Sequence, residues 1–108
     1  MTGPRVLPGA GTEKALARHI AELAKLFGYE RYHTHRSDFS PAGYPDETLC
    51  RPPRLIIAEL KSDQAWRTKN HGLSPAQQKW GRLLKACPGV EFYVWAPHQL
   101  DDIVRILR

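Results

Sequence analysis

The segment 46–61, DETLCRPPRLIIAELK, constrains the fold of this chain more than any other stretch. It holds two strand-like runs separated by Pro52 and Pro53, and so short a connection predicts an antiparallel hairpin. The second run is apolar enough for a buried strand, yet it carries Glu59 and Lys61. Because a chain of 108 residues can bury only a small core, charges inside its central strand need a physical explanation.

The register of this hairpin follows from its turn. If Arg51 pairs with Arg54, Asp46 lies opposite Glu59, and strand alternation puts both acids on one face with Lys61. Two carboxylates at a directly opposed spacing of ~5 Å repel by roughly 3–4 kcal/mol at an effective dielectric constant near 20. Lys61 could offset part of this repulsion, but a divalent cation such as Mg²⁺ fits better because hard ions prefer carboxylate oxygens. The alternative is that Glu59 and Lys61 are solvated at a fraying strand end and that Asp46 is a turn residue.

Such an ion beside a lysine would favour the attack of water on a phosphate, so phosphodiester hydrolysis is the chemistry that the hairpin predicts. The overall charge agrees with an anionic partner, since 16 Lys and Arg residues against 11 Asp and Glu give a net charge of +5. With 42% hydrophobic and 25% charged residues, the composition is that of a folded globular protein and excludes a disordered or fibrous one.

Hydrophobic spacing along the rest of the chain predicts one α/β domain. Apolar residues recur at helical spacing after Thr12 and after Ser74, and both residues suit a helix N-cap. A helix between two buried strands favours a right-handed parallel crossover, so the sheet should be mixed and flanked by helices. The expected elements are helices over 12–28, 74–87 and 100–107, strands over 29–35, 46–51, 54–61 and 90–95, and loops over 37–45 and 62–72.

Residues 1–11 are rich in Gly and Pro, and we expect them to form a flexible arm before a single domain over 12–108. The sequence has neither the apolar core of a signal peptide nor a stretch of roughly 18 apolar residues, which predicts a cytoplasmic protein that is not bound to a membrane. Cys50 and Cys87 are expected to be reduced and to fill small spaces in the core. The second helix should bury an apolar stripe made of Trp80, Leu83, Leu84 and Cys87.

Three motifs in this order, GYPDETL, RPPRLIIAELKS and LSPAQQKW, resemble the VRR-NUC group of the PD-(D/E)xK nuclease superfamily. The resemblance covers residues 13–95. It implies a restriction-endonuclease-like core with the order α-β-β-β-α-β, and a bacterial or phage-encoded enzyme working in the host cytoplasm. It also implies that Asp46 and Glu59 hold Mg²⁺ or Mn²⁺ and that Lys61 orients or activates the attacking water.

The same family tends to have an acidic residue early in the first helix and a glutamine in the helix after the ExK motif. Glu13 and Gln77 match these positions, so the resemblance adds Glu13 to the metal ligands and Gln77 to the catalytic residues. Each has a structural alternative. Glu13 would also interact favourably with a helix dipole, and Gln77 lies three residues after Ser74, as in a capping box.

Glu47 departs from the family pattern, which usually has an apolar residue after PD. By alternation it faces away from Asp46, so it is not expected to be a ligand. His33 is at a position that the family often occupies with histidine, so the resemblance implies that it lines the active site and contacts nucleic acid. A rival hypothesis, that His33, His35 and His71 bind a transition metal, has no ligand spacing that supports it.

The loop SDQAWRTKNHG is longer than in small members of the family and could form a flap that contacts DNA. Arg67 and Lys69 suit phosphates, and Trp66 could stack on a base or wedge a junction. The alternative for Trp66 is that it packs under its own loop.

The favoured function is a Mg²⁺- or Mn²⁺-dependent endonuclease that cleaves branched DNA, such as a Holliday junction, as a homodimer. The dimer is expected to use exposed apolar side chains near the end of the chain: Phe92, Trp95 or Leu107. The alternative is a module that keeps the fold and binds nucleic acid or assembles with partners without cutting.

Overall fold

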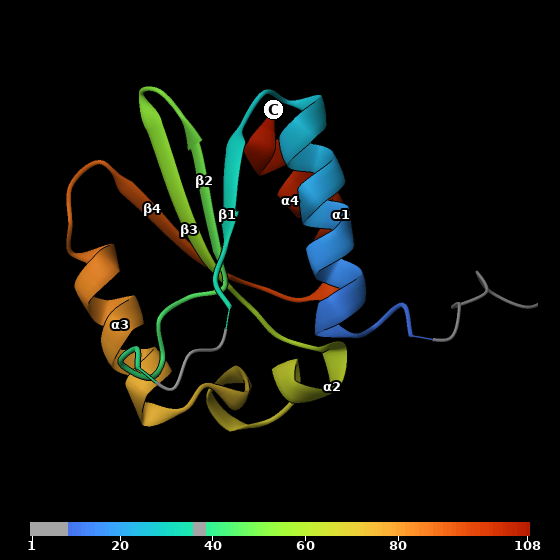
Figure 1. Ribbon diagram of the computed structural model, residues 1–108. Coiled ribbons are helices and arrows are strands. Elements are labelled where there is room, and N and C mark those ends of the chain that lie inside the picture. The colour runs from blue at the N-terminus through green and yellow to red at the C-terminus, as the bar shows by residue number, and fades with distance from the viewer. Residues whose placement is uncertain (1–8, 36–38) are drawn as a thin grey trace, which may run out of the picture.

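A computed structural model describes residues 9–35 and 39–108 of the chain. Its central hairpin pairs β2 (Glu47–Arg51) with β3 (Arg54–Leu60), and the register runs from Arg51 opposite Arg54 to Glu47 opposite Ala58, as predicted. Strands β1 (Glu30–His33) and β4 (Val90–Trp95) lie at the two edges, β1 antiparallel to β2 and β4 parallel to β3. The sheet is therefore mixed, with the order β1-β2-β3-β4 (Figure 1).

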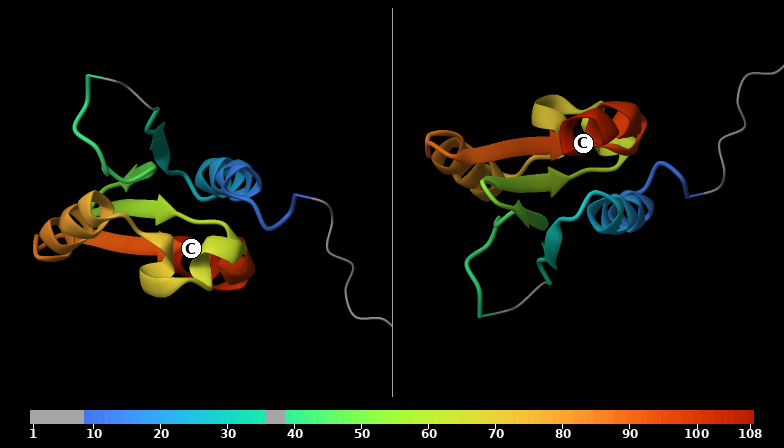
Figure 2. Two further views of the ribbon diagram at one scale, coloured as in Figure 1. Left: turned by 90° about the horizontal axis from the view of Figure 1, so that it is seen from below. Right: turned by 90° about the horizontal axis from the view of Figure 1, so that it is seen from above.

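Helices cover both faces of this sheet, as Figures 1 and 2 show. On one face lie α1 (Glu13–Leu26) and α4 (Leu100–Leu107), and their apolar sides pack on alternate residues of the strands. The opposite face carries α3 (Pro75–Lys85). The side chains that are almost fully buried gather under α1 and α4: Leu16, Ile20, Ala24, Leu49, Ile56, Ala58, Leu60, Trp95, Ile103 and Leu107.

Capping side chains fix where the two long helices begin. Thr12 accepts a hydrogen bond from the amide of Ala15 at the start of α1, and Ser74 with Gln77 forms a reciprocal capping box at the start of α3. Both starts agree with the sequence prediction.

The predicted apolar stripe of α3 is correct only in part, since Trp80 and Leu84 are partly buried and the other two residues are not. Leu83 is 52% exposed, Cys87 is exposed, and the residue that α3 buries is Gly81. A Cβ atom on Gly81 would lie 3.0 Å from Cε2 of Phe92, so the helix backbone itself approaches the sheet at this point. The close approach replaces the packing of large side chains that the spacing predicted.

The stretch predicted as a loop over 62–72 contains two short helices, α2 (Asp63–Trp66) and the 3₁₀ turn η1 (Lys69–Gly72). Ser62 caps α2 by accepting a hydrogen bond from Ala65. Within η1, Asn70 and His71 have φ angles of 54° and 53°, in the left-handed region that non-glycine residues rarely adopt. Helices this short leave no periodicity in a sequence.

Burial corrects two further predictions. Cys50 and Cys87 are both exposed, so neither fills a space in the core. Trp95 and Leu107 are 2% and 0% exposed, so these two side chains belong to the core and are not available for a dimer contact. Of the predicted arm, residues 1–8 lie outside the described part of the chain.

Two arginines tie the hairpin turn to the ends of the helices. Arg51 donates to the carbonyls of Phe27 and Leu107, and Arg54 donates to that of Ile106 and pairs with Glu91 through two hydrogen bonds. Cationic groups at helix C-termini interact favourably with the helix dipoles. Within residues 9–35 and 39–108, no helix combines the length and the hydropathy of a membrane span.

Candidate active site

The two acids of the hairpin meet at the end of the sheet. Asp46 comes directly before β2, where the register continues to place it opposite Glu59 of β3. The Asp46 carboxylate accepts a hydrogen bond of 2.8 Å from the amide of Leu60, and its carbonyl accepts one of 2.8 Å from Thr34. Asp46 is thus held from both neighbouring strands, and its side chain lies within hydrogen-bond reach of the Glu59 carboxyl group.

Glu59 is 3% exposed, and its environment disfavours a negative charge. Burial raises the pKa of its carboxyl group to about 9, with further contributions from the hydrogen bond to Asp46 and from the negative charges of Asp46 and Glu13, while Lys61 acts in the opposite direction. The Glu59 Oε2 atom is buried and accepts no hydrogen bond. The site therefore holds an acid that keeps its proton at neutral pH unless a positive group approaches it.

Lys61 lies two residues along the same strand face and is 9% exposed. Its Nζ donates to the carbonyl of Gly72 at 3.1 Å and to Oε1 of Gln77 at 2.9 Å. The amide nitrogen of Gln77 donates in turn to Oε1 of Glu59 at 3.2 Å. Gln77 thus joins the lysine to the buried acid while its Oε1 also accepts the amide hydrogen of Ser74 in the capping box. The capping box predicted for Gln77 is therefore confirmed, and its catalytic role stays a prediction.

Glu13 lies close enough to this group for its charge to matter. Partial burial and repulsion from Asp46 raise the pKa of Glu13, and Lys61 acts in the opposite direction. Its side chain is mostly exposed at the first turn of α1, and it does not complete a metal cluster with the other two acids. In the described residues no three His, Cys, Asp or Glu side chains are gathered so as to hold a metal ion, and this also leaves the three-histidine hypothesis without support.

Glu47 explains the departure from the family pattern. Its side chain is 0% exposed and faces α1, where Arg31 binds both of its oxygens, at 2.7 and 2.8 Å, and His33 Nδ1 lies 2.7 Å from Oε2. A buried carboxylate is tolerable when it is fully paired in this way. Sequence reasoning missed Arg31, although its spacing of two from His33 puts both on one face of β1, opposite β2.

The predicted flap over 62–72 is closely packed around Trp66. The imidazole of His71 stacks on the indole with the ring centroids 3.6 Å apart, and His98 meets it edge-on at 5.6 Å. This arrangement favours the alternative in which Trp66 packs within its own loop. Arg67 and Lys69 are exposed beside it.

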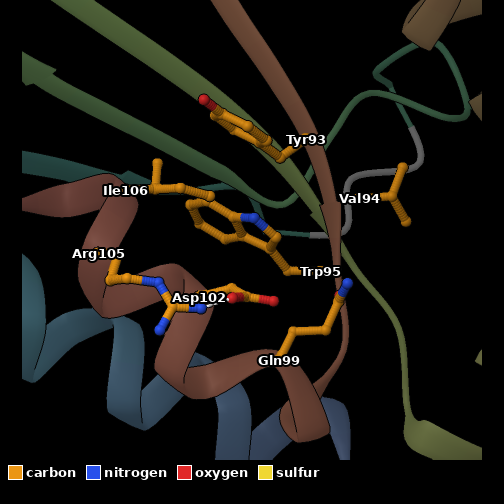
Figure 3. A pocket seen from close by; sticks show the side chains of 7 residues that line it. All are labelled: Tyr93, Val94, Trp95, Gln99, Asp102, Arg105 and Ile106. Carbon is orange, nitrogen blue, oxygen red and sulfur yellow. Dashed lines mark hydrogen bonds and ion pairs between the residues drawn. The ribbon is translucent and has the colours of Figure 1, made fainter.

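A cavity of about 410 Å³ lies away from these acids, between β4 and α4 (Figure 3). Tyr93 and Trp95 form one wall, with their rings stacked at 5.2 Å, and the ion pair between Asp102 and Arg105 lies at the other. Because Tyr93 and Trp95 are on the face of the sheet opposite to Lys61, this cavity is not part of the candidate site.

Comparison with known proteins bears on the fold. No family model matches the sequence, and no curated protein matches it. A solved structure described as "VRR_NUC domain" is similar to this chain with a TM-score of 0.66 and 20% sequence identity, covering 87% of this chain and 96% of the other. The observed topology and this likeness together show that the chain has the restriction-endonuclease-like α/β fold of a VRR_NUC domain.

Proposed function

We propose that the chain is a divalent-metal-dependent endonuclease that hydrolyses DNA phosphodiester bonds. The observation that carries this proposal is the juxtaposition of Asp46 with Glu59, whose buried Oε2 accepts no hydrogen bond, next to a lysine. A protein that used these residues only for stability would gain from replacing such a pair, since buried acids without partners cost free energy.

The residues present fit a hard divalent cation. Asp46 and Glu59 would hold Mg²⁺ or Mn²⁺ through carboxylate oxygens, and Mg²⁺ commonly needs only one or two carboxylates because it keeps several waters. Glu13 adds negative charge near these two acids. When bound, the ion would neutralise the two acids and polarise the scissile phosphate.

The chain's own groups supply the remaining chemistry. Lys61 Nζ is fixed by the Gly72 carbonyl and by Gln77, so it can hold a water molecule by hydrogen bonding and stabilise negative charge that develops on the phosphate. Gln77 keeps the lysine and Glu59 in a constant mutual position. Preorganised donors of this kind are effective because they need not rearrange during the reaction.

We assign the contacts with DNA beyond the scissile phosphate by the charge and position of the side chains. Arg67 and Lys69 are exposed and suit phosphate contacts, while Trp66 supports the same loop from inside. We also assign a nucleic-acid contact to His33, which Glu47 holds on the face of the sheet opposite Glu59 and Lys61. The family resemblance further suggests branched DNA as substrate and a homodimer that cuts two strands.

The test is a cleavage assay with supercoiled plasmid, a flap and a four-way junction in Mg²⁺ or Mn²⁺. Lys61→Ala should reduce the cleavage rate by about 10²-fold or more while DNA binding remains, because it removes a preorganised donor. Lys79→Ala, an exposed lysine on α3, serves as the matched control and should cut like the wild type. Equal cleavage by wild type and Lys61→Ala would remove the lysine from the mechanism. No cleavage of any substrate by the wild type would favour the alternative, a binding or assembly module with the same fold.

A further inference from the structure

A second cavity, of about 450 Å³, opens between α3 and β4. Its apolar surface comes from Phe92 and Val94 of β4 and from Leu73, which precedes α3. Arg82 and Lys85 of α3 line its other side. The cavity thus combines an apolar surface with a cationic wall.

The glycine in α3 explains why this space exists. The helix touches the sheet at Gly81, where a Cβ atom would lie 3.0 Å from the Phe92 ring, and Leu83 points away with 52% of its surface exposed. No large apolar side chain of α3 lines the cavity beside Val94. A glycine inside a helix costs up to about 1 kcal/mol relative to alanine, so this close approach comes at the expense of stability.

The charge around the cavity has one sign. Arg82 and Lys85 are three residues apart, which makes them neighbours on the helix surface, and both are exposed. None of the residues that line the cavity is acidic. An anionic ligand is therefore the complementary partner.

The cavity begins at the candidate site. Gln77 lines it and also binds Lys61 and Glu59, so a chain lying in the cavity would lead directly to the acids. Its volume of about 450 Å³ is enough for one nucleotide but not for a length of base-paired helix. Cationic grooves with an aromatic side chain are the usual binding sites for unpaired strands.

We infer that the cavity between α3 and β4 binds one unpaired nucleic-acid strand next to the phosphate that is cut. Arg82 and Lys85 bind its phosphates, and Phe92 with Val94 contacts a base or sugar. This inference rests on the proposed function, which it extends by naming an unpaired strand as the part of the substrate that the site requires.

The experiment measures binding without cleavage, by fluorescence anisotropy of the full chain in EDTA. The probes are a labelled single strand of twelve thymidines and a labelled duplex of the same length. Arg82→Ala with Lys85→Ala should weaken binding of the single strand by about tenfold and lower the slope of log K against log salt by about 1.4, the value for two phosphate contacts on a single strand. Duplex binding should change by less than about threefold.

Three matched variants isolate the cause. Lys14→Ala with Lys25→Ala removes two exposed lysines of α1, on the other face of the sheet, and should leave single-strand binding unchanged. Arg82→Lys with Lys85→Arg keeps both charges and should restore it. Phe92→Leu keeps an apolar residue and should weaken single-strand binding about fivefold without changing the salt slope.

Unchanged single-strand binding in the Arg82 and Lys85 double variant would overturn the inference, as would an equal loss of binding to the duplex. The outcome is separate from that of the proposed function. If the Arg82 and Lys85 double variant loses single-strand binding but Lys61→Ala still cuts, the inference about the cavity is supported and the proposed role of Lys61 in cleavage is wrong.

Discussion

At the scale of single residues, the protein contains two buried glutamates whose carboxyl groups lie in opposite environments. Glu47 is paired with Arg31 and His33, whereas Glu59 faces a second acid and leaves one oxygen without a donor. Paired buried charges contribute to a unique structure, and unpaired ones persist where function requires them. The contrast fits a structural role for Glu47 and supports the chemical role that we propose for Glu59.

This contrast predicts how stability depends on pH in the absence of metal. The pKa of Glu59 is about 9 in the folded protein and 4.5 in the reference state, so between these values the folded protein must keep a proton that the unfolded chain releases. The stability that this group contributes is present at low pH and is lost as the pH rises. Glu59→Gln should therefore change the free energy of unfolding little near pH 5 and raise it by up to about 4 kcal/mol near pH 8.

Urea denaturation in EDTA at the two pH values measures this difference. Glu22→Gln, an exposed glutamate of α1, is the control and should have no effect at either pH. An effect of Glu59→Gln that is the same at both pH values would contradict the raised pKa.

The positions of Asp46 and Glu59 could be predicted from the sequence because they depend on one short turn. The two prolines limit the connection, the register then follows by alternation, and the acids fall opposite each other. The pairing of Glu47 could not be predicted in this way, since Arg31 belongs to a strand 16 residues away whose register the sequence does not mark. A charged residue in a predicted buried strand indicates that a partner of opposite charge is required, but the sequence does not show which residue that partner is.

At the scale of the elements, the loop 39–45 determines where β2 begins. Gly43 has a φ of +88°, and a Cβ atom at this position would lie 2.6 Å from the carbonyl carbon of Ala76 in α3. The loop therefore packs on the first turn of the helix that carries Gln77. This contact links the entry to β2, and with it Asp46, to the start of α3.

Replacing Gly43 and Gly89 in turn should separate the cost of backbone strain at positive φ from the cost of a steric clash with α3. Gly89 has a similar φ of +84° with open space around it, so Gly89→Ala should lower the free energy of unfolding by only about 1 kcal/mol. Gly43→Ala adds a clash with backbone and should cost at least about 3 kcal/mol. Denaturation of both variants measures the difference. Equal costs would mean that the loop can move away from α3 freely.

The sequence predicted the helices that have a hydrophobic pattern over several turns, and it did not predict the single-turn helices that local contacts stabilise. The two long helices begin at their predicted caps, but α2 and η1 are single turns held by Ser62 and by the stack of Trp66 on His71. For α3, the helix itself was correct and its buried side only in part, because Gly81 brings backbone rather than side chains to the sheet. Such backbone approaches carry no hydrophobic pattern.

At the scale of the whole molecule, the candidate site draws on α1, β3, α3 and the residue before β2. An ion bound between Asp46 and Glu59 would therefore stabilise the complete fold and not one element. At a concentration of about 100 times its dissociation constant, a ligand adds about 2.7 kcal/mol to the free energy of unfolding. For a domain of this size, that raises the thermal midpoint by roughly 10 °C.

Thermal unfolding monitored by circular dichroism with and without Mn²⁺ tests this prediction. The wild type and Glu22→Gln should both gain, and Asp46→Asn should not. A gain of the same size in Asp46→Asn would mean that manganese binds elsewhere.

The double role of Gln77 has a final consequence. The first turn of a helix frays readily, and in most proteins this local opening leaves the rest of the fold unchanged. In α3 the side-chain amide of Gln77 completes the capping box and also links Lys61 to Glu59. Opening of the first turn would therefore separate these two side chains. For the proposed nuclease, warming should therefore abolish cleavage at temperatures where the rest of the molecule is still folded, and a more stable first turn would raise the upper temperature limit of cleavage.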